Sequence, residues 1–208
     1  MVRTLSGQEF GQVLRSGAFA VVRSQSTLDR INAFPVADAD TGTNLVATLS
    51  AAAAALGRTP PSAIGSAARL AADAALIGAR GNSGAIFAQF LHGLAEGLHL
   101  KKGVATVEFA LAATAGVDAA YLAVQHPREG TILSVLRAWA GDMSDHAPTL
   151  PDFRELMDRA LAAARVALAH TPNQLEVLAR NNVVDAGGGR GSSISLRACW
   201  TPFGEVAC

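Results

Sequence analysis

The sequence predicts an all-α protein. Half of the 208 residues are hydrophobic, yet aromatic residues make up only 5%, and alanine supplies much of the apolar count, as in residues 51–55 and 71–75. Alanine has the highest helix propensity, and its small side chain lets helices pack closely. No segment alternates apolar and polar residues as strands of a sheet do. We therefore expect a single helical domain, which at this length can bury a sizeable core.

Helical character recurs along the chain, in residues 5–22, 24–31, 43–56, 63–76, 84–98, 106–123, 132–141, 151–170 and 171–181. A break is expected near Gly17. Pro35 disfavours the α conformation in the residue before it, so a loop must precede the helix at 43–56. Ser62 and Thr106 stand at suitable N-cap positions for the next helices. Prolines at first-turn positions open the last two helices, beginning with Pro151.

The bulk properties exclude several classes of function. The chain has 17 basic and 17 acidic residues without a basic run, which argues against a nucleic-acid-binding face. Its two cysteines, Cys199 and Cys208, form neither a disulfide framework nor a zinc-binding spacing. No signal-peptide core opens the chain, and no apolar run is long enough for a membrane span. We therefore expect a cytoplasmic protein.

The first polar loop carries Asp38 and Asp40 directly before a helix that begins near Thr43. Magnesium prefers oxygen ligands and is usually held by one or two carboxylates together with substrate phosphates. Side chains at i and i+2 of a loop can converge on one ion, and the N-terminus of the following helix can bind a phosphate. Spacing alone leaves a simpler alternative open, in which Asp40 only caps the helix and Asp38 is solvated.

Three further loops place glycine beside polar side chains. Residues 78–84 combine three glycines with Asn82 and Ser83 and can form an anion-binding nest, although the lysine and spacing of a P-loop are absent. Residues 183–188 place Asp185 beside glycines, and Thr131 follows a glycine in a weaker fourth loop. Each loop alone has another explanation: a tight helix connection, a glycine helix stop or an ordinary N-cap.

Together, the loops resemble the ATP-binding domain family of dihydroxyacetone kinase, and most closely the N-terminal kinase domain of the fatty acid kinase catalytic subunit. The matching segments follow one another in the family's order: NAFPVADADTGTN at residues 32–44, GARGNSG at 78–84, EGTIL at 129–133 and VVDAGG at 183–188. The resemblance extends over residues 5–191. Agreement of separate motifs in one order makes it specific.

The resemblance implies an antiparallel helical barrel or bundle of about eight helices, with the nucleotide site on loops at one end. It implies ATP or ADP and two Mg²⁺ ions as ligands, with Asp38 and Asp40 as catalytic and metal-binding residues. Asn32 stands where dihydroxyacetone kinase has a third aspartate, and it would add an uncharged metal ligand. The residues implied to bind the nucleotide are Thr41, Gly42, Thr43, Asn44, Asn82, Ser83, Gly84, Thr131, Asp185 and Gly187.

The implied activity is transfer of the γ-phosphoryl group of ATP to an acceptor held by a partner protein. In the fatty acid kinase branch the acceptor is a fatty acid carboxylate on a fatty-acid-binding, DegV-like carrier. In the dihydroxyacetone kinase branch it is dihydroxyacetone on its own binding subunit. A non-catalytic nucleotide- or lipid-binding module is a further alternative, and a homodimer is compatible with the family. The lack of an obvious nucleophile suits phosphoryl transfer, which depends mainly on positioning and charge neutralisation.

Two features at the C-terminal end depart from the family. The last family loop usually has glutamine after its glycine pair, whereas this chain has Gly189, Arg190 and Gly191. Residues 192–208 show no helical stripe where a closing helix is expected. We therefore expect a nucleotide-binding domain over 1–191 followed by an irregular tail, and a chain that needs a partner or further domains for full activity.

Overall fold

The computed structural model describes residues 2–188. The loop at 189–191 and the predicted tail at 192–208 lie outside the described residues. Within them the chain forms α1 (Gly7–Arg30), α2 (Thr41–Leu56), α3 (Ile64–Gly78), α4 (Gly81–Gly97), α5 (Thr106–Leu122), α6 (Ile132–His146), α7 (Phe153–Gln174) and α8 (Glu176–Arg180). Strands β1 (Leu5–Ser6) and β2 (Gly103–Val104) pair antiparallel. The prediction of an all-α fold is confirmed.

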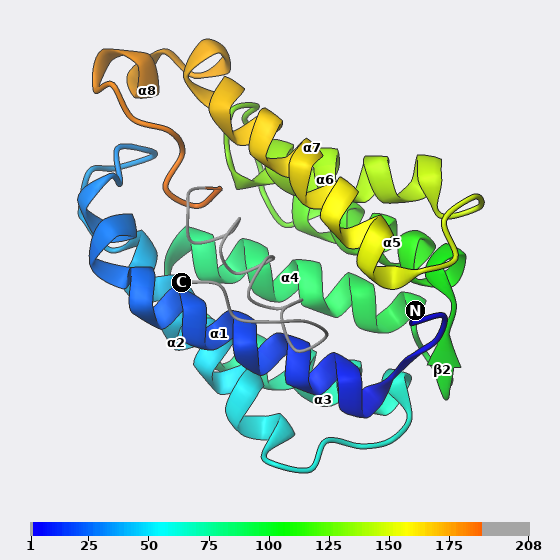
Figure 1. Ribbon diagram of the computed structural model, residues 1–208. Helices are drawn as coiled ribbons and strands as arrows, with labels where there is room; N and C mark the ends of the chain where they lie inside the picture. Colours follow the sequence, from blue (N-terminus) through cyan, green and yellow to red (C-terminus); the bar gives the residue numbers. More distant parts are fainter. Residues whose placement is uncertain (1, 189–208) are drawn as a thin grey trace.

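Helices that follow one another in the chain pack against each other, and α2 also contacts α4. Figure 1 shows α4 between α1–α3 on one side and α5–α7 on the other. The loop at 31–40 and the segment after α8 lie at one end of the molecule, and the β1–β2 pair lies at the other (Figure 1). The loops that carry the sequence motifs therefore gather at one end.

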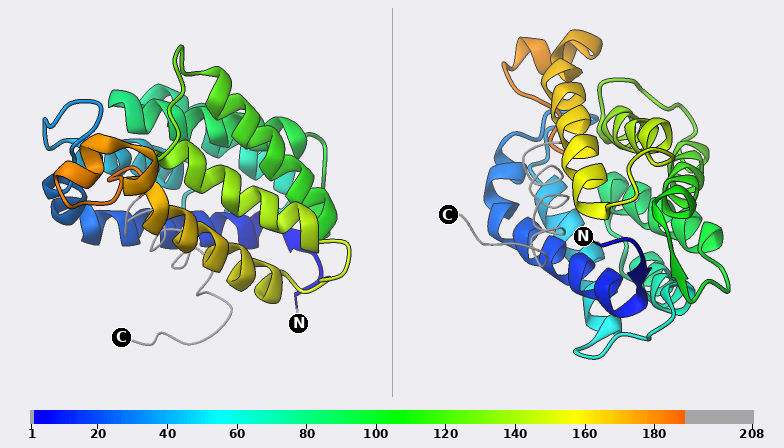
Figure 2. Two further views of the ribbon diagram at one scale, coloured as in Figure 1. Left: turned by 90° about the horizontal axis from the view of Figure 1, so that it is seen from above. Right: turned by 45° about the vertical axis from the view of Figure 1, so that its right-hand side comes forward.

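The start of the chain is fixed by two helix caps. Ser6 and Glu9 form a capping box on α1, in which the Ser6 N–H donates to the Glu9 carboxylate at 2.8 Å. Asp152 caps α7 by accepting from the Arg154 N–H at 2.8 Å, and it also accepts from the Val2 N–H at 2.8 Å. Both views of Figure 2 accordingly place the N-terminus beside the loop that precedes α7.

Small residues bring the central helices into close contact. A Cβ atom added to Gly93 of α4 would lie 2.5 Å from the carbonyl oxygen of Ala115, and one added to Gly116 of α5 would lie 2.7 Å from that of Phe90. Buried alanines continue this pattern along α3 and α5. The Phe90 ring in turn meets Trp139 of α6 edge to face at 6.0 Å. None of the helices in the described range is both long and apolar enough to cross a membrane.

Several helix starts and ends differ from the prediction. The expected break near Gly17 was wrong, because that glycine is buried inside a continuous α1, where packing outweighs its low helix propensity. Ser62 and Thr106 do not cap α3 and α5 as expected. Ala63 and Ala105 occupy these N-cap positions and provide no side-chain acceptor. Thr106 is instead buried as the first residue of α5, and its hydroxyl donates to a carbonyl at the end of α6 at 3.2 Å. Helix α6 extends five residues beyond residue 141, to His146.

The helix predicted over 171–181 does not begin at Thr171 and Pro172, which belong to the last turn of α7, and only the short α8 falls in the rest of that range. A proline inside a helix leaves the carbonyl four residues earlier without its usual N–H donor. Here that carbonyl belongs to Leu168, and the Thr171 hydroxyl donates to it at 2.8 Å. This side-chain donor replaces the missing backbone donor, and α7 continues through the proline.

Candidate functional site

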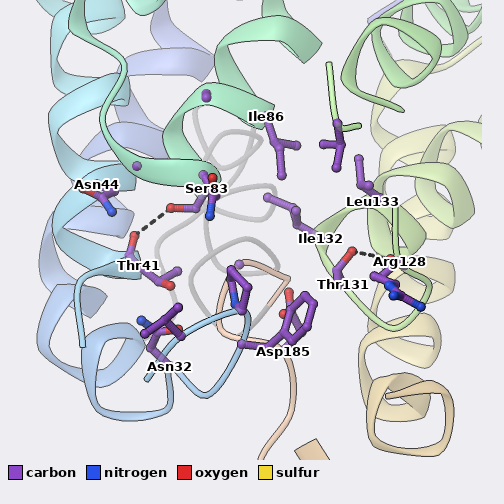
Figure 3. Close-up of a pocket in the computed structure, with 18 of the residues that line it drawn as sticks. Asn32, Thr41, Asn44, Ser83, Ile86, Arg128, Thr131, Ile132, Leu133 and Asp185 are labelled. Atoms are coloured by element: carbon purple, nitrogen blue, oxygen red, sulfur yellow. Dashed lines mark hydrogen bonds between the residues drawn. The ribbon is translucent and has the colours of Figure 1, made fainter. Parts of the chain in front are cut away.

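A cavity of about 450 Å³ opens where the loops before α2, α4 and α6 meet (Figure 3). Its volume is typical of small-molecule sites. The loops come from distant parts of the chain, so only the fold brings them together. The predicted site residues that line the cavity are Asn32, Asp38, Asp40, Thr41, Asn44, Asn82, Ser83, Thr131, Asp185 and Gly187.

Three predicted nucleotide-contact residues, Gly42, Thr43 and Gly84, do not line the cavity. The Thr43 N–H and hydroxyl both donate to the carboxylate of Asp29 on α1 at 3.0 Å. A Cβ atom on Gly42 would lie 2.4 Å from a carbonyl oxygen of α1, and one on Gly84 would lie 2.3 Å from the Thr48 hydroxyl. These residues hold α1, α2 and α4 together, and Asp29 provides the cap that α2 lacks at its own N-cap position.

The acidic end of the cavity is formed by the loop before α2. The Asn32 side-chain N–H donates to Asp38 at 2.7 Å, while the Asn32 amide oxygen is buried without a hydrogen-bond partner among the described residues. Ala39 adopts a left-handed conformation, with φ of 56°, between Asp38 and Asp40. The Phe34–Pro35 peptide bond is cis in the same loop.

This donor set fits magnesium. The unpartnered amide oxygen of Asn32 and the carboxylates of Asp38 and Asp40 are the hard oxygen ligands that Mg²⁺ prefers. In residues 2–188 no group of three histidine, cysteine, aspartate or glutamate side chains is placed to hold a metal. Magnesium does not require such a cage, because it usually keeps several waters and takes further oxygens from phosphates.

The N-terminus of α4 faces the same cavity. Arg80 at its N-cap position provides no side-chain cap, and the N–H groups of Gly81, Asn82 and Ser83 have no acceptor within the described part of the chain. The Ser83 hydroxyl points back to the carbonyl of Thr41 at 3.4 Å (Figure 3). Free N–H groups and the positive end of the helix dipole make this helix start suited to an anion such as a phosphate.

Asp185 closes the cavity from the last described loop. Its side chain is 5% exposed and accepts hydrogen bonds from the backbone N–H groups of Gly188, at 2.6 Å, and of Ile132 and Gly187. Burial raises the pKa of Asp185 to about 6, although these N–H donors partly oppose the shift. The Asp185 N–H donates to the Thr171 hydroxyl at 3.1 Å. One residue thus joins this loop to the start of α6 and the end of α7.

A hydrogen-bond network supports the turn before α6. Glu129 accepts from the Ser134 hydroxyl at 2.5 Å and from the Arg137 guanidinium at 2.6 Å. Ser134 also accepts from the N–H of Gly130, which has φ of 80°. Burial alone would raise the pKa of Glu129, but the donors Ser134 and Arg137 and the charge of Arg137 outweigh it and lower the pKa. Glu129 is therefore an anion that fixes the turn carrying Thr131.

Away from the acidic loop the cavity lining is mixed: Ile86, Val124 and Leu133 are apolar, and Gln125 and His126 of the loop after α5 are polar. Arg128 lies in this part of the cavity, and the Thr131 hydroxyl donates to its carbonyl at 2.8 Å (Figure 3). No sequence motif distinguishes Arg128, and its position directly before the EGTIL segment was the available signal. Asp29 had no such signal, because an aspartate inside a helical segment has no distinguishing pattern.

Comparison with known proteins identifies the class to which this fold and cavity belong. Residues 35–201 match the family described as the DAK2 domain, and the chain belongs to this family. The chain is similar to the protein YloV of Bacillus subtilis, with 38% identity over 187 residues that cover 90% of this chain and 34% of that protein. An uncharacterized protein of Staphylococcus saprophyticus is 37% identical over 188 residues, with the same coverage of 90% and 34%. The predicted family resemblance is confirmed.

A solved structure shows the same fold. The dihydroxyacetone kinase from C. freundii, in complex with AMP-PNP and Mg²⁺, matches with a TM-score of 0.68 and 14% sequence identity over 90% of this chain and 32% of that chain. The chain therefore spans about a third of the length of the curated relatives and of this structural neighbour.

Proposed function

We propose that this chain is a kinase-type ATP-binding domain that holds Mg²⁺ and ATP in the cavity for transfer of the γ-phosphoryl group. The observation that carries the proposal is that the Asp38–Asp40 loop and the open N-terminus of α4 face one cavity. Membership of the DAK2 domain family supports it. The structural neighbour, a dihydroxyacetone kinase that binds AMP-PNP and Mg²⁺, supports the same ligand pair.

The charges in the cavity support the metal assignment. Asp38, Asp40 and Asp185 line it, and a triphosphate would add further negative charge. Like charges at short range repel strongly in a partly buried site. Magnesium, when bound, supplies the positive charge that lets carboxylates and phosphates share the site and neutralises charge during transfer. Asn32, Asp38 and Asp40 are the residues that would hold it.

The other residues have positioning roles in this proposal. The N–H groups of Gly81, Asn82 and Ser83 bind phosphate oxygens at the start of α4. The apolar side chains of Ile86 and Leu133 cover the adenine ring. Phosphoryl transfer depends mainly on this kind of positioning, so the absence of a nucleophile from the proposed roles is expected.

The acceptor in our proposal is a fatty acid carboxylate presented by a fatty-acid-binding carrier. The segments NAFPVADADTGTN and GARGNSG favour this branch over dihydroxyacetone, which is the alternative acceptor. In both cases a partner protein would hold the acceptor at the open mouth of the cavity.

Titration calorimetry with ATP, with and without Mg²⁺, tests the nucleotide site. We expect Mg²⁺-dependent ATP binding in the wild type and its loss in Asp38→Ala and in Asp40→Ala. Both variants should fold normally, because the loop carboxylates bury little apolar surface. Asp158→Ala changes an exposed aspartate on α7 and should bind as the wild type does. Unchanged Mg²⁺-dependent affinity in both loop variants would contradict the assignment.

A further inference from the structure

The cavity has two chemically different ends. In Figure 3, Asn32, Thr41 and Ser83 lie on one side, whereas Leu133 and Arg128 lie on the opposite side. The first side holds the acidic loop and the open start of α4. Under the proposed function, on which this inference rests, the phosphates bind there. The nucleobase must then extend toward the opposite side, where Arg128 lies.

The Arg128 side chain has no protein partner among residues 2–188. It is exposed at the cavity mouth, and it is the only lysine or arginine of the described chain that lines the cavity. The neighbouring carboxylate of Glu129 is already engaged by Arg137 and Ser134. The Arg128 backbone is fixed, since its carbonyl accepts from the Thr131 hydroxyl at 2.8 Å. A cation on a fixed turn is thus left available to a ligand.

The surroundings of Arg128 determine which part of the ligand suits it. Ile86 of α4 and Leu133 of α6 line the cavity, and the loop that carries Arg128 also contributes Val124, Gln125 and His126. No other lysine or arginine lines the cavity in the described range. The apolar members of this lining favour a flat aromatic ring over a charged phosphate. A guanidinium is planar, always charged and weakly hydrated, so it stacks readily on the face of such a ring.

We propose that Arg128 determines nucleobase specificity by stacking its guanidinium on the purine ring of the bound nucleotide. Arg128 contributes to the binding affinity of the base, whereas the loop aspartates and the start of α4 act on the phosphates. Purine nucleotides should gain more binding affinity from Arg128 than pyrimidine nucleotides do, because their larger ring system offers more surface for stacking.

Inorganic tripolyphosphate separates the two ends of the site experimentally, because it has the phosphates of ATP but no base. Calorimetry on the full chain with Mg²⁺ compares ATP, UTP and tripolyphosphate for the wild type, Arg128→Met and Arg128→Lys. We expect Arg128→Met to bind ATP about five- to tenfold more weakly and to bind tripolyphosphate as the wild type does. Its preference for ATP over UTP should fall accordingly.

The lysine variant distinguishes stacking from charge alone. An ammonium keeps the charge but has no plane to stack, so Arg128→Lys should also lose ATP affinity while its tripolyphosphate affinity is unchanged. Arg58→Met is the matched control, because Arg58 is exposed in the loop after α2, beyond the end of the helix that lies away from the cavity. It should match the wild type for all three ligands. Circular dichroism confirms the fold of each variant.

Two results would overturn the role of Arg128. Equal loss of ATP and tripolyphosphate affinity would show that the guanidinium acts on the phosphates. Unchanged ATP affinity in Arg128→Met would show that it does not contact the nucleotide. A wild-type chain that binds neither ligand would instead overturn the proposed function itself, and this inference with it, so the two failures are distinguishable.

Discussion

Asp185 combines deep burial with a network of backbone donors, and this makes its ionisation a measurable contribution to stability. Its pKa is raised from 3.8 to about 6 in the folded protein. The folded state therefore binds more protons than the unfolded state between these two values, and stability contributed by this residue falls as pH rises. Well below pH 3.8 Asp185 is protonated in both states and does not change the unfolding free energy. Well above pH 6 it is ionised in both states, and the unfolding free energy is lower by about 3 kcal/mol.

Replacing Asp185 with asparagine tests this cost. The asparagine side chain cannot ionise, so we expect the unfolding free energy of Asp185→Asn, relative to the wild type, to rise by about 2 kcal/mol between pH 4 and pH 7. Urea unfolding across this range measures it. The wild-type comparison removes the contribution of other carboxylates, which titrate in both proteins. A constant difference between the two proteins over this range would show that Asp185 ionises normally.

Single residues differ in how far the sequence predicts their roles. Asp38, Asp40 and Asp185 were assigned to one site through the family resemblance, because each of their loops alone also fits a helix cap or a glycine helix stop. Thr43 belonged to the same motif, yet its hydroxyl bonds Asp29 on α1. That contact joins residues 14 positions apart, on two helices whose packing no local pattern specifies.

At the scale of the helix, Gly81 controls where α4 begins. It has φ of 55°, and an added Cβ atom would lie 2.1 Å from the side-chain nitrogen of Asn44. We expect Gly81→Ala to destabilise the fold by about 2 kcal/mol or more, because left-handed backbone strain and the clash add together. ATP affinity should fall as well, since the start of α4 is displaced. Chemical denaturation and calorimetry measure the two effects.

The same substitution elsewhere provides the control for Gly81→Ala. Gly141 is exposed inside α6, and an added Cβ atom would meet nothing within 4 Å. Gly141→Ala should therefore stabilise the protein by about 0.5–1 kcal/mol, because alanine has the higher helix propensity. If both variants were destabilised alike, the special role of the α4 start would be refuted.

Helices were predictable as elements, but their ends depended on tertiary contacts. The periodicity of the alanine-rich segments locates α2, α3 and α5 within a few residues. The continuation of α7 through Pro172 depends on the Thr171 hydroxyl, which could equally have capped a new helix. The two-residue strands β1 and β2 are too short to show any alternation. Their pairing follows from the helices that bring them together.

At the scale of the whole molecule, the cavity is a product of the fold and not of any one segment. Its walls come from the loops before α2, α4 and α6 and from the segment after α8. The family resemblance supplied the expectation that these loops meet at one end, since no local pattern relates residues so far apart. The two chemically distinct ends of the cavity, including Arg128, emerge only from the assembled structure.

The mouth of this cavity determines our expectation for activity. Under the proposed function the described lining residues serve the phosphates and the metal, and we assign none of them to a pocket for the acceptor. Correct placement of the acceptor oxygen against the γ-phosphorus is worth roughly 7–11 kcal/mol of barrier lowering. We therefore predict that the isolated chain binds ATP but releases ADP slowly, and that a fatty-acid-loaded carrier accelerates the release. The measurement is ADP release with and without the loaded carrier. Asp38→Ala is the inactive control, and dihydroxyacetone with its binding subunit is the alternative acceptor. Rapid transfer to free fatty acid without any partner would show instead that the acceptor site lies within this chain.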